Sequence, residues 1–203
     1  MERQIIEIAD ILVGAKITET DLKVNGIMKK LAILSLDNVL GQEECFTLDN
    51  TIKKDSSEIK DPKEIVEVSF SKKIKGSLIQ KEDLLIPIKK KNHKCLYVNW
   101  SDDSRPMNFI YNTETLIIRV DRSIIHPRFM YYLLNTKNIL DYINEKANKK
   151  TPNRVTCEFM NSLKLEVPPI EEQEKILKTI EKLNVERQKI EEQLNDYGKN
   201  IKR

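Results

Sequence analysis

The last 34 residues are the part of the chain whose sequence most restricts the fold. From Ile170 onward there is no proline, and the apolar residues recur on alternating steps of four and three if Arg187 fills the one intervening position. The positions of this seam are Ile176, Ile180, Leu183, Arg187, Ile190, Leu194, Tyr197 and Ile201. Because such steps keep residues on one helix face, the spacing predicts a single long helix with the seam of a coiled coil.

The narrowness of the seam indicates what the helix packs against. A helix on a globular core usually has a third apolar position in each heptad, whereas this seam is flanked by Glu181, Lys182, Glu186, Lys189, Glu191 and Glu192. We therefore expect one partner helix, with Arg187 weakening the seam locally while helping to fix its register. A helix that lies back on its own domain is the alternative.

The residues before Pro168-Pro169 have a different pattern, which predicts a domain over residues 1–169 and a helical arm over residues 170–203. Short β-branched runs between polar turns predict strands at Ile5–Val13, Met28–Leu36, Ile65–Phe70, Asp83–Ile88, Cys95–Val98, Thr115–Val120 and Leu163–Val167. The runs DLLIPI and TLIIRV are almost continuously apolar, as in strands buried on both faces. The fold class expected is α+β, with a mixed sheet and these two runs as its central strands.

The apolar period becomes helical between Pro127 and Asn148. Pro127 stands where proline often opens a helix, and the pattern predicts one helix that is broken or bent near Asn135. The polar stretch KANKKTPNRVT that follows has too few apolar residues for a core, and it predicts an exposed loop.

No residue pattern in the sequence indicates catalysis. The five glycines form neither GxGxxG nor GxxxxGK[ST], and neither His93 nor His126 lies in a nucleophile motif. The segment Lys164-Leu165-Glu166 reverses the Glu-x-Lys order common in metal-dependent nucleases. We therefore expect no catalytic residues, no metal site and no cofactor.

The cysteines and the hydropathy indicate the compartment. Cys45, Cys95 and Cys157 lie far apart and form no CxxC pair, so we expect reduced packing residues rather than disulfides or zinc ligands. No apolar stretch approaches the roughly 18 residues of a membrane span, and charges interrupt the first 14 residues. A cytoplasmic protein is expected.

Positive charge gathers in the middle of the chain. Residues 1–71 hold 9 Lys/Arg and 14 Asp/Glu (net −5), residues 72–169 hold 18 and 10 (net +8), and residues 170–203 hold 8 and 8 (net 0). Such asymmetry is typical of a polyanion-binding face, although a solvated lysine-rich surface gives the same count. The segment KKKNHKCLYVNW forms a basic cluster between two predicted strands, which is either a groove-reaching loop or a solvated hairpin tip.

These features define a set of candidate nucleic-acid contacts. Lysines neutralise phosphates, whereas asparagine and arginine carry the paired groups that discriminate base edges, so Asn153 and Arg154 are the better candidates for base contact and His93 for phosphate contact. The full set is Lys16, Lys89, Lys90, Lys91, Asn92, His93, Lys94, Trp100, Arg105, Lys149, Lys150, Thr151, Asn153 and Arg154.

Several segments resemble the specificity subunits of type I restriction-modification systems. The sharpest is VPPIEEQEKILKTI, similar to the family's P-P-L-x-E-Q-x-x-I signature where a recognition domain passes into its long helix, with Ile170 in place of Leu. IIEIADILVGAKI resembles the opening strand and its glycine, here Gly14, and RFMYYLLNTKNILDYINEKANKKTPNRVTCEFMNSLKLEV resembles the helix, loop and final strand. QKEDLLIPIKKKNH resembles a Gly-Asp strand and basic loop, with Glu82 where glycine is usual.

The resemblance implies a target-recognition domain that reads one half of a bipartite duplex DNA site. In that family a full subunit has two such domains, separated by helices that pair as an antiparallel coiled coil and dock methyltransferase subunits. This chain has one of each, so the resemblance implies either a half-length subunit that forms a homodimer or a fragment of a longer protein; its initiating Met and the ending IKR favour the former slightly. Methylation, and any cleavage by a restriction subunit, would belong to partner subunits that bring the cofactors. The alternative is a coiled-coil adaptor that binds protein or RNA without DNA sequence readout.

Overall fold

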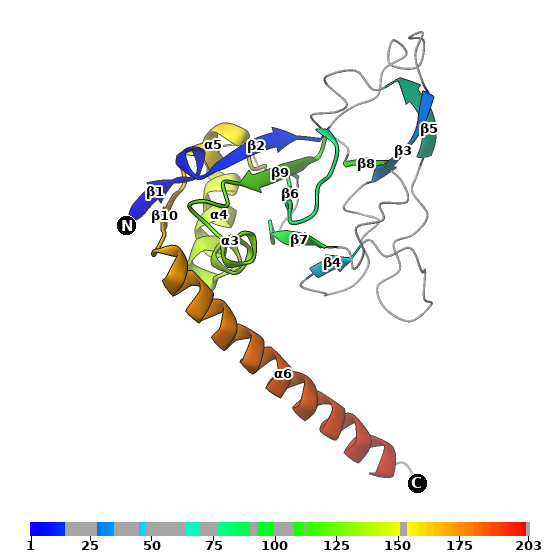
Figure 1. Ribbon diagram of the computed structural model, residues 1–203, viewed down its shortest axis with the longest axis vertical. Helices are drawn as coiled ribbons and strands as arrows, with labels where there is room; N and C mark the ends of the chain where they lie inside the picture. Colours follow the sequence, from blue (N-terminus) through cyan, green and yellow to red (C-terminus); the bar gives the residue numbers. More distant parts are fainter. Residues whose placement is uncertain are drawn as a thin grey trace.

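A computed structural model describes residues 1–14, 28–34, 45–47, 64–69, 77–89, 93–99, 108–111, 113–150 and 154–201. These residues form an α+β domain from which one long helix projects (Figure 1). The expected fold class and the expected C-terminal helix are confirmed, whereas pairing of that helix into a coiled coil is not tested by a single chain.

A five-stranded mixed sheet forms the centre of the domain, in the order β2-β9-β6-β7-β4. Its strands are β2 (Ala9–Val13), β4 (Cys45–Thr47), β6 (Leu84–Pro87), β7 (Leu96–Asn99) and β9 (Thr115–Val120). Among the described strands of this sheet, β4 and β7 pair in parallel and the other neighbours pair in antiparallel register. All four residues of β6 are buried, as are Leu116, Ile117 and Ile118 of β9, so the two apolar runs are interior strands as predicted.

The other described strands form two smaller sheets. The order β5-β3-β8 joins β5 (Glu64–Ser69) and β8 (Asn108–Tyr111) to β3 (Met28–Leu34), and the β3–β8 pair is parallel. The other sheet pairs β1 (Glu2–Gln4) with β10 (Lys164–Glu166) in antiparallel register. The runs predicted as strands are confirmed within about two residues, except that the predicted strand from Ile5 begins with a 3₁₀ turn, η1 (Ile5–Glu7). Strands β1, β4 and β8 were not predicted.

The helical region divides where the sequence predicted a break. Helix α3 (Pro127–Leu134) has proline in its first turn, and α4 (Lys137–Lys150) follows after Asn135 and Thr136. The Asn135 side chain clamps the start of β7: its Oδ1 accepts the Cys95 N–H (3.0 Å) and its Nδ2 donates to the Cys95 carbonyl (2.9 Å). The break therefore places two side-chain hydrogen bonds against the sheet.

Helix α4 corrects one expectation. It continues to Lys150, so Lys149 and Lys150 end a helix rather than belong to the predicted loop. The short helix α5 (Cys157–Ser162) was also missed, and its N-cap is Thr156, whose hydroxyl accepts the Phe159 N–H (3.2 Å).

The main core lies between the five-stranded sheet and helices α3 to α5. Ile5, Ile8, Met130 and Met160 are fully buried there, and the Tyr131 ring of α3 lies 5.9 Å from the Tyr97 ring of β7. Cys95 is a buried packing residue, as expected, and burial raises the pKa of its thiol. Cys157 is half-buried.

Helix α6 (Ile170–Ile201) is one continuous helix, as predicted, but its first turns lie on its own domain. Leu177, which lies outside the predicted seam, is 7% exposed and belongs to the core, and Ile180 of the seam is half-buried. In the first turns Leu177 thus supplies the third apolar position typical of a core-facing helix. Ile176 of the seam is exposed, and pairing of Ile176 and Ile180 with a second helix stays a prediction. Farther along, Leu183, Ile190, Leu194 and Tyr197 are exposed.

Two absences concern only the described parts of the chain. Within those ranges, no helix is both long enough and apolar enough to cross a lipid bilayer. Over the same residues, no group of three or more His, Cys, Asp or Glu side chains is arranged to hold a metal ion.

Candidate nucleic-acid interface

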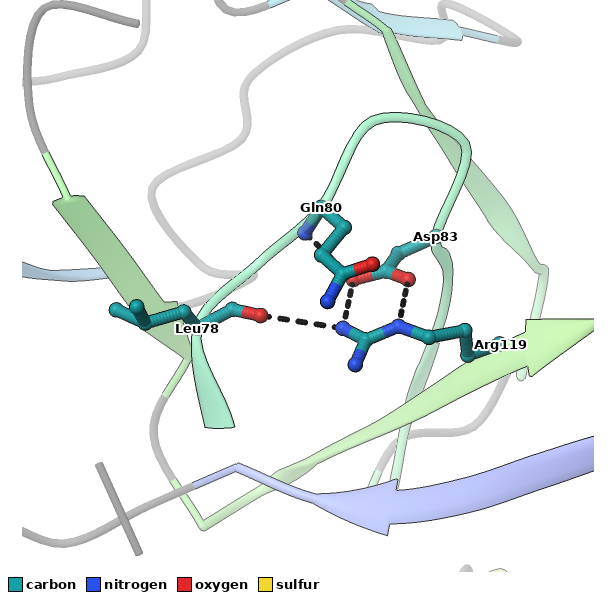
Figure 2. A network of polar contacts seen from close by, with 4 residues as sticks. All are labelled: Leu78, Gln80, Asp83 and Arg119. Atoms are coloured by element: carbon teal, nitrogen blue, oxygen red, sulfur yellow. Dashed lines mark hydrogen bonds and ion pairs between the residues drawn. The ribbon is translucent and has the colours of Figure 1, made fainter. Parts of the chain in front are cut away.

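An ion pair with a buried carboxylate fixes the start of strand β6, whose far end carries the basic segment. Asp83 is 1% exposed, and its two carboxylate oxygens accept hydrogen bonds from Nε (2.9 Å) and Nη2 (2.8 Å) of Arg119 on β9 (Figure 2). Arg119 Nη2 also donates to the Leu78 carbonyl (3.1 Å), and the Gln80 N–H donates to Asp83 Oδ2 (2.7 Å). This bidentate pairing fixes the β6–β9 register.

The turn before Asp83 has an uncommon backbone conformation. Glu82 has φ of 71°, in the left-handed region that favours glycine, and its N–H donates to the Val98 carbonyl (2.8 Å). Its carboxylate lies 2.6 Å from Arg122 Nη2, a contact that a glycine could not make. Glu82 therefore adopts the geometry expected of the glycine that stands here in the pattern noted above.

The end of β6 meets a segment that lies 65 positions away in the sequence. An isolated antiparallel bridge pairs Lys89 with Arg154, and the Val155 N–H donates to the Ile88 carbonyl (3.0 Å). The Ile88 N–H in turn donates to the Glu114 carbonyl (2.8 Å). The basic segment after β6 and the polar segment after α4, identified separately in the sequence, are thus joined through their backbones.

The described cations of this junction are accessible to a ligand. Arg154 is exposed, Lys94 is half-buried, and the Lys89 side chain is 57% exposed. Lys89 Nζ lies 3.2 Å from Glu114 Oε1. An ion pair so exposed contributes about 0–1 kcal/mol, so Lys89 can exchange this carboxylate for a phosphate at little cost.

His93 is a correction to the predicted set. Its side chain is 1% exposed, and its Nδ1 lies 2.7 Å from the Pro87 carbonyl, which can only accept a hydrogen bond, so Nδ1 carries the proton. Desolvation lowers the pKa of His93, against a smaller opposing effect of that hydrogen bond. A buried, hydrogen-bonded imidazole cannot reach a phosphate; His93 instead anchors the return of the basic segment to the domain.

The other predicted contacts divide by what the structure describes. Lys149 and Lys150 end helix α4, and only their backbone is described. The remaining predicted residues lie outside the described ranges: Lys16, Lys90, Lys91, Asn92, Trp100, Arg105, Thr151 and Asn153.

Two residues that support the junction were missed by sequence reasoning. Asn144 of α4 accepts the His93 N–H with its Oδ1 (3.1 Å), and Glu114 faces Lys89. Asn144 is the polar residue next to Ile143 in an otherwise regular helical pattern, and no local signal distinguishes it from a solvated asparagine. Both contacts depend on segments brought together only in the folded domain.

Comparison with known proteins identifies the family of this chain. The profile of the family "Type I restriction modification DNA specificity domain" matches residues 1–197. The chain belongs to this family. The resemblance noted in the sequence is thereby confirmed.

Individual specificity proteins are more distant. The chain is 28% identical over 124 residues to the type I restriction enzyme HindI specificity subunit of Haemophilus influenzae, covering 58% of this chain and 26% of that protein. The structure of the HsdS subunit from Thermoanaerobacter tengcongensis matches with a TM-score of 0.55 and 15% identity, over 92% of this chain and 37% of that one. A chain from a structure on complex assembly and conformational transition of a type I R-M system matches with a TM-score of 0.55 and 16% identity. The match covers 92% of this chain and 38% of that one.

These solved structures share the fold of the family member described here. The chain spans about a quarter to two fifths of the length of these relatives. What the longer proteins do as wholes therefore enters only through the proposal that follows.

Proposed function

We propose that this chain reads one half of a bipartite duplex DNA target for a type I restriction-modification complex and performs no chemistry itself. The observation that carries the proposal is the Lys89–Arg154 bridge, which joins the two candidate contact segments in a member of a DNA specificity family. Methyl transfer, and cleavage where a restriction subunit takes part, belong to partner subunits.

The distal part of α6 supports a dimeric unit. Its exposed seam residues can be covered by the same residues of a second copy, in the manner of a coiled coil. An antiparallel pair would place the two recognition domains at opposite ends of helices of 32 residues, each about 48 Å long at 1.5 Å per residue. That span is comparable with about 14 base pairs at 3.4 Å each, so the preferred DNA would be an inverted repeat with a central spacer.

Selection from random duplexes tests the recognition itself. The chain, with and without a methyltransferase subunit, is incubated with the duplex pool, and the bound fraction is sequenced. An enriched interrupted motif is the expected result. If no sequence is enriched under either condition, the proposal fails and a coiled-coil adaptor for protein or RNA is favoured instead.

Single substitutions test the junction as the contact surface. Lys89→Ala should weaken DNA binding and reduce the slope of log affinity against log salt by about 0.9, because one phosphate contact is lost. Arg154→Ala should relax preference at one base position, by about 1–3 kcal/mol if Arg154 binds a guanine bidentately. Lys164→Ala and Arg122→Ala are matched controls, since both side chains are more than half exposed and ion-paired elsewhere. Equal effects of a test variant and its control would remove the junction from the interface.

The other lysines predicted to contact DNA extend the same test. Alanine at Lys90, Lys91, Lys94 or Lys150 should weaken binding, each lysine reducing the salt dependence by about one counterion. Asn153 is the second candidate for base readout, since asparagine can bind adenine bidentately. A Lys90, Lys91 and Lys94 triple alanine variant with an unchanged isotherm would contradict the basic segment as a DNA contact.

A further inference from the structure

Helix α6 is attached to the domain through a fully buried polar side chain. Gln173 is 0% exposed in the first turns of α6. Its Oε1 accepts the His126 N–H (2.8 Å), while its Nε2 donates to the Ile124 carbonyl (3.0 Å) and to the Pro168 carbonyl (2.8 Å). Because the partners are one N–H and two carbonyls, only one orientation of the amide satisfies all three.

The three partners come from two separate segments. Ile124 and His126 belong to the turn that leads into α3, and Pro168 belongs to the exit from β10. The first turn of α6 is therefore held at two places by one side chain. Leu177, one turn farther along, is buried in the core and prevents rotation about that point.

Further contacts extend the attachment along the helix. Arg128 Nη1 on α3 lies 2.6 Å from Glu181 Oε1, and Asn184 Nδ2 donates to the Tyr132 hydroxyl (3.2 Å). The Tyr132 ring packs edge-on against Tyr131, with ring centroids 5.0 Å apart. From Gln173 to Asn184 the attached length is about 16 Å at 1.5 Å per residue, beyond which α6 projects away from the domain (Figure 1).

We propose that Gln173 is a positioning residue that fixes the direction of α6 and thereby the spacer length accepted between two half-sites. The proposal rests on the dimeric DNA-reading function proposed above. The projecting part from Val185 to Ile201 is about 25 Å long, so a swing of roughly 10° would displace its end by about 4 Å. When the helix is held in the dimer, the same swing turns the domain instead, and a DNA-contact face at a similar distance from the attachment shifts by more than the rise of one base pair, about 3.4 Å.

The test is duplex selection with full-length Gln173→Ala, in which the three main-chain groups lose their partner. The base sequence of each half-site should stay unchanged, because the junction around Lys89 and Arg154 is not altered. The distribution of spacer lengths should broaden from one length to several. Affinity for the wild-type spacing should fall about ten-fold, as part of the gain from bivalent binding is lost. Gln173→Glu keeps the acceptor for the His126 N–H but loses both donated bonds, and it should broaden the spacer as well.

Controls separate positioning from folding. Gln188→Ala removes an exposed glutamine from the same helix and should leave the spacer distribution unchanged. If thermal melting shows that Gln173→Ala does not fold, the Arg128→Ala/Asn184→Ala double variant weakens the outer attachment instead and should broaden the spacer to a smaller extent.

The outcomes distinguish the two proposals. A wild-type chain that selects an interrupted motif of one spacing, together with folded Gln173 or outer-attachment variants that select the same spacing, overturns the positioning role and leaves DNA recognition intact. A wild-type chain that selects no interrupted motif overturns the proposed function, and the positioning role with it. Broadened spacing with retained half-sites supports both.

Discussion

The two ends of helix α6 differ in the side chains that they bury: the first turns bury a polar residue, and the last turns expose apolar ones. In its first turns the buried residues include Gln173, which is 0% exposed, whereas its last turns expose Leu194 (63%) and Tyr197 (71%) to solvent. A buried amide with all hydrogen bonds satisfied gives up little stability and fixes one geometry. Exposed apolar area at coiled-coil spacing contributes no stability until a partner removes it from water. Its burial then contributes about 25 cal/mol per Å². We therefore propose that the first turns orient the helix and that the last turns associate with a partner helix.

The largest expected effect is loss of association when the distal seam is charged. Ile190→Asp/Leu194→Asp should yield monomers in sedimentation at micromolar concentration, with DNA affinity reduced roughly a hundredfold through lost bivalency. Ile180 is less suited to this test because it is half-buried beside its own domain. A wild-type chain that already sediments as a 23.8 kDa monomer would contradict the dimer and point to a helix of another subunit as the partner.

A substitution in the proximal turns should instead lower the folding stability of the domain. Leu177→Ala should lower the free energy of unfolding by about 2 kcal/mol, since it removes buried methyl groups near the edge of the core. Leu194→Ala is the matched control and should change it by less than about 0.5 kcal/mol. Urea denaturation is measured at a protein concentration below the dissociation constant of the dimer, because association adds apparent stability. Equal losses in both variants would erase the distinction between the two parts of the helix.

A smaller effect is expected at the polar position of the seam. Arg187 lies close to the middle of the helix and pairs with Glu191 (3.6 Å), with both side chains more than half exposed. In an antiparallel dimer it would lie near its own symmetry mate, so Arg187→Leu should tighten dimerisation by about ten-fold. Arg187→Lys, which keeps the charge, should leave the dissociation constant nearly unchanged. Weaker association of the leucine variant would argue against this helix register.

The smallest effect is expected at the ion pair that crosses from α3 to α6. Arg128→Ala should change the free energy of unfolding by less than about 0.5 kcal/mol, because both side chains are substantially exposed and the pair is screened. Denaturation at low and high salt measures it. A loss above about 1 kcal/mol would show that the attachment depends on this pair rather than on Gln173 and Leu177.

Local pattern predicted most of the elements and few of the tertiary contacts. The runs around β6 and β9 and the break at Asn135 follow from apolar periodicity and proline placement. The strand β1, with the letters ERQ, carries no β pattern of its own and exists because β10 pairs with it. His93 was wrongly predicted to contact phosphate because four lysines surround it in the sequence, while its ring is buried in the fold.

The arm shows the same limit within one helix. Its length and seam follow from spacing, but the face that touches the domain depends on where α3 lies. Gln173 stands within the motif that revealed the family resemblance, and yet its letter alone does not say that it is buried or what it binds. Its three partners are separated from it by 5 to 49 positions in the sequence.

The pairing of β1 with β10 also has a consequence for how the chain folds during synthesis. Glu2 pairs with Glu166, the Ile5 N–H donates to the Leu163 carbonyl (3.0 Å), and the Val167 N–H donates to the Met1 carbonyl (2.9 Å). The ribosome must therefore deliver about 160 further residues before the first strand meets its partner, and contacts of such high sequence separation slow folding. Helix α6 follows β10 directly in the chain, so its seam is synthesised only after all the strands of the domain that it carries.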